Sequence, residues 1–257
     1  MTYAWRIFFA VLGISLLAGC AREETEAQGP IVLAAASLQE VLEASADAWE
    51  AEGHPRPVLS FAGTAALARQ VEAGAGGDLF VSADEIWMGQ LQADGLLVAG
   101  SRQRLAGNRL ALIAPAGSTT TSEIGPGMDI VAAMQGGRLA MAEPDSVPAG
   151  RYARESLQAL GQWNAVKERL AIGESVRVAL QIVSRAEAPL GIVYRTDALA
   201  EPNVRIVGLF PASSHSPISY PVARLLASEN PEAEAFEAFL LSARGQAIFA
   251  RYGFLPG

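Results

Sequence analysis

The sequence predicts an α/β fold, because short apolar runs alternate with amphipathic stretches of helical periodicity from residue 30 onward. Its 257 residues are 51% hydrophobic and 18% charged, which argues against disorder. That length is enough for one large or two modest domains. Several helical stretches also end at a glycine, as expected where a left-handed residue closes the last turn. These three observations together predict a folded chain of alternating strands and helices.

The elements follow one another with short connections. We expect strands at 31–36, 57–62, 78–83, 108–117, 136–144, 189–194, 204–210 and 220–228, and helices at 38–53, 65–74, 85–95, 151–161, 175–188 and 229–253. The first three helices are expected to stop at Gly53, Gly74 and Gly95. We find no internal repeat of fixed period.

Charge and residue usage argue against several classes of function. Nineteen Lys and Arg against 27 Asp and Glu give a net charge of −8, so the basic surface of a nucleic-acid-binding protein is missing. A single Cys leaves no disulfide framework and no cysteine-based zinc site, and two His make a multi-histidine metal site improbable. We therefore expect no nucleic-acid partner and no bound cofactor.

The N-terminal segment has the features of an export signal. Arg6 precedes an apolar run over 7–19, which is shorter than the roughly 20 residues of a membrane-spanning helix. Residues Leu17 to Cys20 spell LAGC and resemble a bacterial lipobox, so 1–19 would be a lipoprotein signal peptide. Residues 20–29 would be the tether that starts at lipidated Cys20. The alternative is an ordinary secretory signal in which Cys20 is a bystander.

Four helix starts share small residues and hydroxyl groups. Ser37 follows three alanines and opens a Ser-x-x-Glu capping box, and Thr64 follows a strand and a glycine. Pro148-Ala149-Gly150 and Ser175-Val176 mark two more starts. Each taken alone is explained by helix capping. Together they suggest backbone amides that converge on an anion, because first-turn N–H groups carry partial positive charge.

The order of these segments resembles the periplasmic molybdate-binding proteins, the solute receptors of ABC-type molybdate uptake systems. The resemblance covers nearly the whole chain after the signal. It is carried by AAASL at 34–38, SFAGTAALARQVEAG at 60–74, DLFVSAD at 78–84, VPAGRYARESL at 147–157, APLGIVY at 188–194, the SH/YPVA pattern at 214–223 and RYGF at 251–254. It implies the two-lobe periplasmic binding protein fold of type II, with ligand in the interlobe cleft. The implied first lobe is 30–108 plus 220–257, and the implied second lobe is 109–219.

The resemblance also assigns the residues that hold the oxyanion. Carried over by motif, they are the hydroxyls of Ser37, Thr64 and Tyr194 and the backbone amides of Ala149 and Val176. These groups would contact the molybdenum only through molybdate oxygens. The sequence departs from the family at Gly63-Thr64, where many members have consecutive serines. Threonine keeps the O–H donor but adds a methyl group. Arg151 follows the third helix start and is expected to be solvated.

The implied function is capture of molybdate, and of tungstate of nearly the same size, for delivery to an ABC permease with a cytoplasmic ATPase. The resemblance implies an extracytoplasmic monomer anchored through Cys20 and without enzymatic activity. Sulfate would be excluded because its smaller tetrahedron leaves donors out of reach. No nucleotide site is expected on this chain, since it lacks G-x-x-x-x-G-K-[ST].

Two other readings remain open. A receptor for sulfate, phosphate or a small organic acid would need the same donors at a different spacing. A serine hydrolase would use Ser37 or Ser82 with His54 or His215. The hydrolase is disfavoured because the chain has no G-x-S-x-G elbow and neither histidine lies in a motif for a general base.

Overall fold

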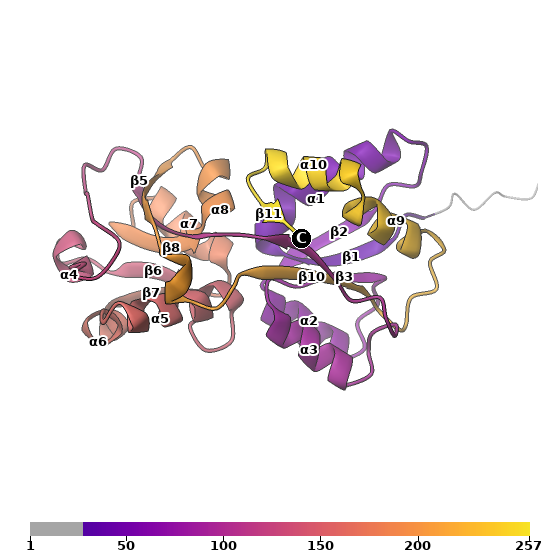
Figure 1. Cartoon of the computed structure of the whole chain (residues 1–257), viewed down its shortest axis with the longest axis horizontal. Helices are drawn as coiled ribbons and strands as arrows, with labels where there is room; N and C mark the ends of the chain where they lie inside the picture. Colours follow the sequence, from indigo (N-terminus) through magenta and orange to yellow (C-terminus); the bar gives the residue numbers. More distant parts are fainter. Residues whose placement is uncertain (1–27) are drawn as a thin grey trace, which may run out of the picture.

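Two β-sheets, each flanked by helices, organise the chain into two lobes that lie side by side (Figure 1). The structure is a computed structural model that describes residues 28–257. The predicted signal peptide, Cys20 and most of the predicted tether lie outside the described residues. The α/β class predicted from the sequence is confirmed.

The first lobe contains a six-stranded sheet in the order β11-β4-β10-β3-β1-β2. Its strands are β1 (Ile31–Ala35), β2 (Val58–Ala62), β3 (Leu79–Val81), β4 (Gln103–Gly107), β10 (Ser219–Arg224) and β11 (Leu255–Pro256). Its helices are the 3₁₀ turn η1 (Ala36–Leu38), α1 (Gln39–Glu50), α2 (Thr64–Glu72), α3 (Glu85–Ala93), α9 (Glu232–Leu241) and α10 (Ala243–Arg251). β1 pairs in parallel with β2 and β3, and β10 pairs antiparallel with β3 and β4.

Alternation along the central strands buries both faces of this sheet. Val32 packs in the cluster that contains Phe236 of α9 and Phe249 of α10. Its neighbour Leu33 points to the other face, in the cluster with Leu67 of α2 and with residues of α3. Because successive side chains of a strand point to opposite faces, a continuous apolar run is what a sheet covered on both sides requires.

The second lobe contains a five-stranded sheet in the order β7-β6-β8-β5-β9. Its strands are β5 (Leu110–Pro115), β6 (Leu139–Ala142), β7 (Leu170–Gly173), β8 (Leu190–Tyr194) and β9 (Val204–Leu209). Its helices are α4 (Ile130–Ala133), α5 (Pro148–Ala159), α6 (Trp163–Val166), α7 (Val176–Ser184) and α8 (Arg195–Ala200), with 3₁₀ turns η2 (Lys167–Arg169) and η3 (Ala212–Ser214). Helices α5 and α7 both pack on β5, β6 and β8.

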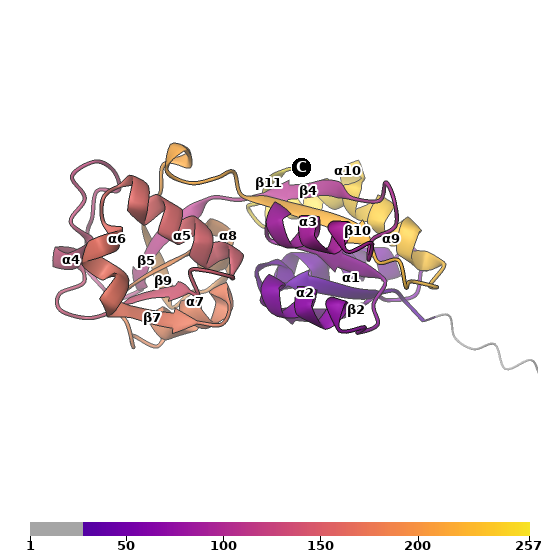
Figure 2. The same ribbon diagram turned by 90° about the horizontal axis from the view of Figure 1, so that it is seen from below.

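The chain passes between the lobes in two places, which lie next to each other (Figure 2). One crossing joins β4 to β5 and the other joins β9 to β10. β4 and β10 are neighbours in the first sheet, and Gly107 is paired with Ser219. The two connections therefore leave the first lobe side by side.

Most predicted elements are present, with some differences. The expected helix stops at Gly53, Gly74 and Gly95 are confirmed, with φ of 91°, 86° and 71°. The single helix predicted over 229–253 is wrong, because it is divided at Ser242, whose hydroxyl caps α10 through the amide of Gly245 at 3.2 Å. β4, β7 and α8 were not foreseen. Within residues 28–257, no helix combines the length and apolar character needed to cross a bilayer.

Candidate anion-binding site

A small cavity lies between the lobes where several helices begin. All of the residues that the resemblance assigned to the oxyanion line it. The lining comprises Ala35, Ala36, Ser37, Gly63, Thr64 and Ala83 from the first lobe and Val147, Pro148, Ala149, Ser175, Val176 and Tyr194 from the second. Residues more than 150 positions apart in the sequence thus line the same cavity, because the two lobes face each other across it.

Ser37 reaches the cavity from the turn that follows β1. It lies in the 3₁₀ turn η1 and is 2% exposed. The predicted capping box at Ser37 is wrong, because Leu38 is the N-cap of α1 and no side chain caps either helical segment. The Ser37 hydroxyl instead lies 3.1 Å from the Tyr220 hydroxyl on β10. The strand runs directly into the 3₁₀ turn, so the serine is one residue too early to cap α1.

Thr64 is the first residue of α2, behind the N-cap Gly63. It is 2% exposed, and its Oγ1 accepts a hydrogen bond from the backbone N–H of Ala83 at 3.1 Å. A backbone amide can only donate, so the Thr64 oxygen is an acceptor in this contact. The hydroxyl proton of Thr64 is therefore left for a partner in the cavity.

Ala149 and Val176 bring backbone amides to the cavity. Ala149 lies in the first turn of α5 after Pro148, and Val176 is the first residue of α7. First-turn N–H groups have no partner within their own helix and carry partial positive charge. Ser175 caps α7 by accepting from the Val178 amide at 3.3 Å, which leaves the Val176 amide to the cavity.

Gly150 allows α5 to begin this close to the sheet. A Cβ at this position would lie 2.1 and 2.4 Å from the backbone oxygens of Glu143 and Ala142. Such distances are far below van der Waals contact, so a side chain here would push the helix away from β6. The glycine therefore sets where the Ala149 amide lies.

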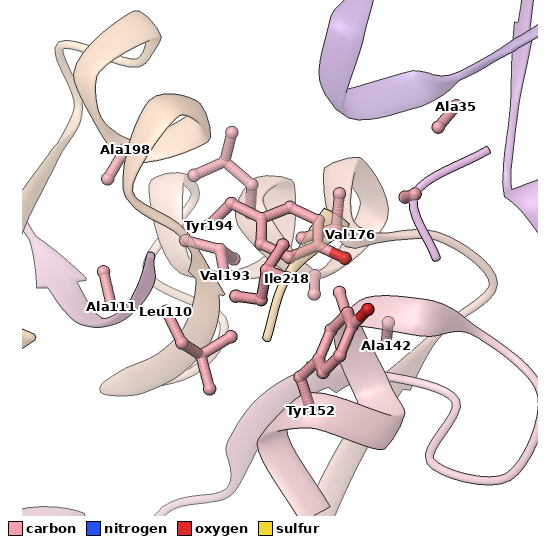
Figure 3. Packing of buried hydrophobic residues seen from close by; sticks show 14 of the residues in the cluster. Ala35, Leu110, Ala111, Ala142, Tyr152, Val176, Val193, Tyr194, Ala198 and Ile218 are labelled. Carbon is pink, nitrogen blue, oxygen red and sulfur yellow. The ribbon is translucent and has the colours of Figure 1, made fainter. Parts of the chain in front are cut away.

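Tyr194 completes the cavity from the end of β8. It is 1% exposed, and its hydroxyl has no hydrogen-bond partner among the residues that the structure describes. Figure 3 shows the ring of Tyr194 beside Val176. Burial raises the pKa of Tyr194 well above its usual value, so the hydroxyl stays protonated and can donate.

No charged side chain lines this cavity, but buried and partly buried ion pairs of Arg177 follow directly after Val176, which lines it. The Arg177 guanidinium of α7 contacts Glu40 of α1, with Nη1 to Oε1 at 2.6 Å, and its Nε lies 2.7 Å from Oδ1 of buried Asp197. Burial raises the pKa of Asp197 to about 6, although Arg177 acts in the opposite direction. The Arg177–Glu40 pair joins the second lobe to the first at the rim, whereas the Arg177–Asp197 pair lies within the second lobe.

Arg151 is not solvated, contrary to the expectation from the sequence. Its guanidinium pairs with Asp84 of the first lobe, and both side chains are largely buried. Together they line a neighbouring cavity, not the one described above. Nearby, the Trp87 indole N–H donates to the Ser146 carbonyl at 2.8 Å, also from one lobe to the other. No local pattern predicts these contacts, since the two partners of each lie on different lobes.

The residues that a hydrolase would use are not brought together. The ring of His54 stacks on Trp49 at 3.6 Å and its Nδ1 lies 3.1 Å from Glu232, in the first lobe away from the cavity. His215 does not line the cavity either, and the Ser82 hydroxyl donates to the backbone oxygen of Asp84 at 2.6 Å. Across residues 28–257, no group of three or more His, Cys, Asp or Glu could hold a metal ion.

Comparisons with known proteins agree with this architecture. Residues 31–255 match the family described as bacterial extracellular solute-binding protein. The molybdate-binding protein ModA of Escherichia coli (strain K12) is 41% identical over 256 residues, 99% of each chain. The protein of that name from Haemophilus influenzae is 43% identical over 226 residues, 87% of this chain and 88% of its own. The putative ABC transporter substrate-binding lipoprotein YvgL of Bacillus subtilis is 33% identical over 97% of each chain.

A solved structure shares the two-lobe fold. The substrate binding domain of a putative molybdenum ABC transporter from Clostridium difficile is 32% identical, with a TM-score of 0.68 over 89% of this chain and 99% of its own. The predicted type of fold is thereby confirmed, and so is the expectation of a binding protein without enzymatic activity. The chain belongs to the bacterial extracellular solute-binding protein family.

Proposed function

We propose that this chain captures molybdate in the interlobe cavity and delivers it to an ABC importer. The observation that carries the proposal is the donor set of the cavity, in which hydroxyls and helix-start amides of both lobes converge and no charged side chain takes part. The names of the relatives from Escherichia coli and Haemophilus influenzae support molybdate as the ligand. The proposed ligand-binding residues are Ser37, Thr64, Ala149, Val176 and Tyr194.

The chemistry of the cavity suits a tetrahedral dianion. Molybdate oxygens at neutral pH only accept hydrogen bonds, so a pocket for them needs donors and no carboxylate. Thr64 and Tyr194 offer hydroxyl protons, and Ala149 and Val176 offer amides with the positive end of a helix dipole behind them. Binding would satisfy the buried Tyr194 hydroxyl, whose lack of a partner is otherwise unfavourable.

Size would decide between oxyanions of equal charge. Sulfate presents the same acceptors on a smaller tetrahedron, so donors from opposite lobes could not all reach it, and an unmade buried hydrogen bond costs about 1–3 kcal/mol. Tungstate has nearly the dimensions of molybdate and is proposed as a second ligand. A receptor for sulfate, phosphate or a small organic acid is the alternative that the experiment below tests.

Ligand binding is proposed to close the lobes about the two adjacent crossings. In the arrangement described here the Arg177–Glu40 and Arg151–Asp84 pairs join the lobes, which supports a closed form held together at the rim. The closed monomer would present a surface of both lobes to the membrane permease. We also propose that Cys20 is lipidated and holds the protein outside the cytoplasm.

Isothermal titration of residues 21–257 with molybdate, tungstate, sulfate and phosphate tests the ligand. Molybdate and tungstate should bind tightly and sulfate and phosphate weakly. Molybdate at 100 times its Kd should also stabilise the folded state by about 2.7 kcal/mol in thermal melting. Tight binding of sulfate or phosphate in place of molybdate would support the alternative receptor.

A pair of serine variants links the binding to this cavity. Ser37→Ala removes one donor and should weaken molybdate binding by about 10- to 100-fold. Ser45→Ala is the matched control, because Ser45 is also buried in the first lobe but its hydroxyl donates to the Val41 carbonyl within α1 at 2.7 Å. Equal affinities for both variants would place the ligand elsewhere.

A further inference from the structure

A buried chain of hydrogen bonds leads from the crossings between the lobes to Ser37. Asn108 lies in the crossing between β4 and β5, and Tyr220 lies on β10 close to the other crossing. The Asn108 Nδ2 donates to the Tyr220 hydroxyl at 3.2 Å and to the Thr196 hydroxyl of the second lobe at 2.8 Å. The Tyr220 hydroxyl lies 3.1 Å from that of Ser37. All these side chains are buried.

The direction of each hydrogen bond follows from the Asn108 amide. Its Oδ1 accepts from the backbone N–H of Arg109 at 2.8 Å. A backbone N–H can only donate, so this contact fixes which end of the amide is oxygen and which is NH₂. The NH₂ end has two protons, and the contacts to Tyr220 and Thr196 use both of them. The Tyr220 oxygen is therefore an acceptor toward Asn108.

The Asn108 contact leaves one arrangement of the protons on the hydroxyls of Tyr220 and Ser37. With its oxygen accepting from Asn108, Tyr220 has its own proton to give, and the atom within reach is Oγ of Ser37. Burial raises the pKa of Tyr220, so this proton is retained. Once Ser37 accepts from Tyr220, its own proton is left for another acceptor, and Ser37 lines the interlobe cavity.

Thr64, the other first-lobe hydroxyl of the cavity, is oriented in the same way. Its oxygen accepts from the Ala83 amide at 3.1 Å, which leaves its proton for the cavity. Both hydroxyls of the first lobe are thus held as donors by groups behind them. A hydroxyl in water can accept as readily as it donates, so this polarity is a property of the fold and not of the residue type.

We propose that Asn108 and Tyr220 are positioning residues that hold the Ser37 hydroxyl as a hydrogen-bond donor and thereby select oxyanions that carry no proton. This inference rests on the proposed function and adds a second basis of selectivity to size. Molybdate and tungstate present only acceptors at neutral pH. Inorganic phosphate still carries a proton there, and that proton needs an acceptor that the oriented hydroxyls do not offer.

The test is a thermodynamic cycle on titrations with molybdate and inorganic phosphate at pH 7. Tyr220→Phe keeps the ring packed against Tyr194 and Phe254 but removes the group that orients Ser37. Molybdate affinity should fall about 5- to 10-fold while phosphate affinity stays the same or rises, so that the ratio of the two falls at least about 5-fold. The same two ligands are compared in wild type and variant, so a difference in ligand size does not account for a changed ratio of molybdate to phosphate affinity.

The cycle then asks whether Tyr220 acts through Ser37. In a Ser37→Ala background, Tyr220→Phe should change molybdate affinity less than about 2-fold. Tyr152→Phe is the control, because Tyr152 is a buried tyrosine of the second lobe whose hydroxyl does not line the cavity. Melting temperatures of all variants report whether each one folds.

A second variant reverses the direction of these hydrogen bonds without replacing Tyr220. Asn108→Asp places a carboxylate where the NH₂ donated, so Tyr220 would donate to it and accept from Ser37. The ratio of molybdate to phosphate affinity should then fall by more than about 10-fold.

The outcomes separate this inference from the proposed function. Suppose that the wild type binds molybdate. Additive effects of Tyr220→Phe and Ser37→Ala, or a ratio of molybdate to phosphate affinity that the variants leave unchanged, would then overturn the roles of Asn108 and Tyr220 alone. Wild-type protein that binds no oxyanion would overturn the proposed function, and the inference with it.

Discussion

Replacing Tyr194 by phenylalanine isolates a single donor of the proposed site. Tyr194 is 1% exposed and its buried hydroxyl has no hydrogen-bond partner within residues 28–257, so removing the hydroxyl breaks no hydrogen bond that the structure contains. A hydrogen bond to a charged partner contributes about 1.5–3 kcal/mol. The variant should therefore bind molybdate about 10- to 150-fold more weakly. The melting temperature without ligand should not fall, because the aromatic ring and its packing remain.

Isothermal titration of wild type and Tyr194→Phe with molybdate measures this difference. Tyr152→Phe serves as the control, since Tyr152 packs edge-to-face against Tyr194 with ring centroids 6.5 Å apart but does not line the cavity. The control should keep affinity within about 2-fold of wild type. A loss below about 3-fold for Tyr194→Phe would refute a role of this hydroxyl in binding.

Two further variants test the rim and the start of α5. Glu40→Gln removes the partner of Arg177 across the lobes. Because the pair is partly exposed, the affinity for molybdate should fall only about 2- to 5-fold, and the loss should be smaller at 500 mM than at 20 mM salt. Glu43→Gln on the same helix is the control. Gly150→Ala should lower the free energy of unfolding, measured in urea, by about 1–3 kcal/mol or more, because its Cβ would lie 2.1 and 2.4 Å from two backbone oxygens. In the control Gly76→Ala the new Cβ meets open space, so the free energy of unfolding should change little. An effect of salt on both Glu variants alike, or equal stability of the two Gly variants, would contradict these assignments.

Local sequence patterns predicted much of the fold because they act within a few residues. Apolar runs bounded by Gly and Pro gave the central strands, and Gly53, Gly74 and Gly95 ended helices with positive φ. The division between α9 and α10 was missed because the helical periodicity continues through Ser242. The serine caps a new helix there, and Gly245 approaches the Phe239 oxygen too closely for a side chain.

The cavity lining was predictable only in part. Ser37 and Thr64 were found because each follows a strand within a recognisable motif, yet the roles of their oxygens were not. Those roles depend on Tyr220 and Ala83, which lie far from them in the sequence. The burial of Arg151 was missed for the same reason, since its partner Asp84 belongs to the other lobe. A pattern along one chain segment carries no information about such contacts.

The lining carries no side chain that is charged at neutral pH, and this has a consequence for where the protein can work. Hydroxyls and amides keep their protons from about pH 5 to pH 9, and the pKa of Tyr194 is raised further above that range. A histidine cage would lose its positive charge as its surroundings turned alkaline, and salt would screen the charge of an arginine cage. Outside the cell membrane, pH and ionic strength follow the environment. The affinity of this cavity for an oxyanion should therefore change little with pH there.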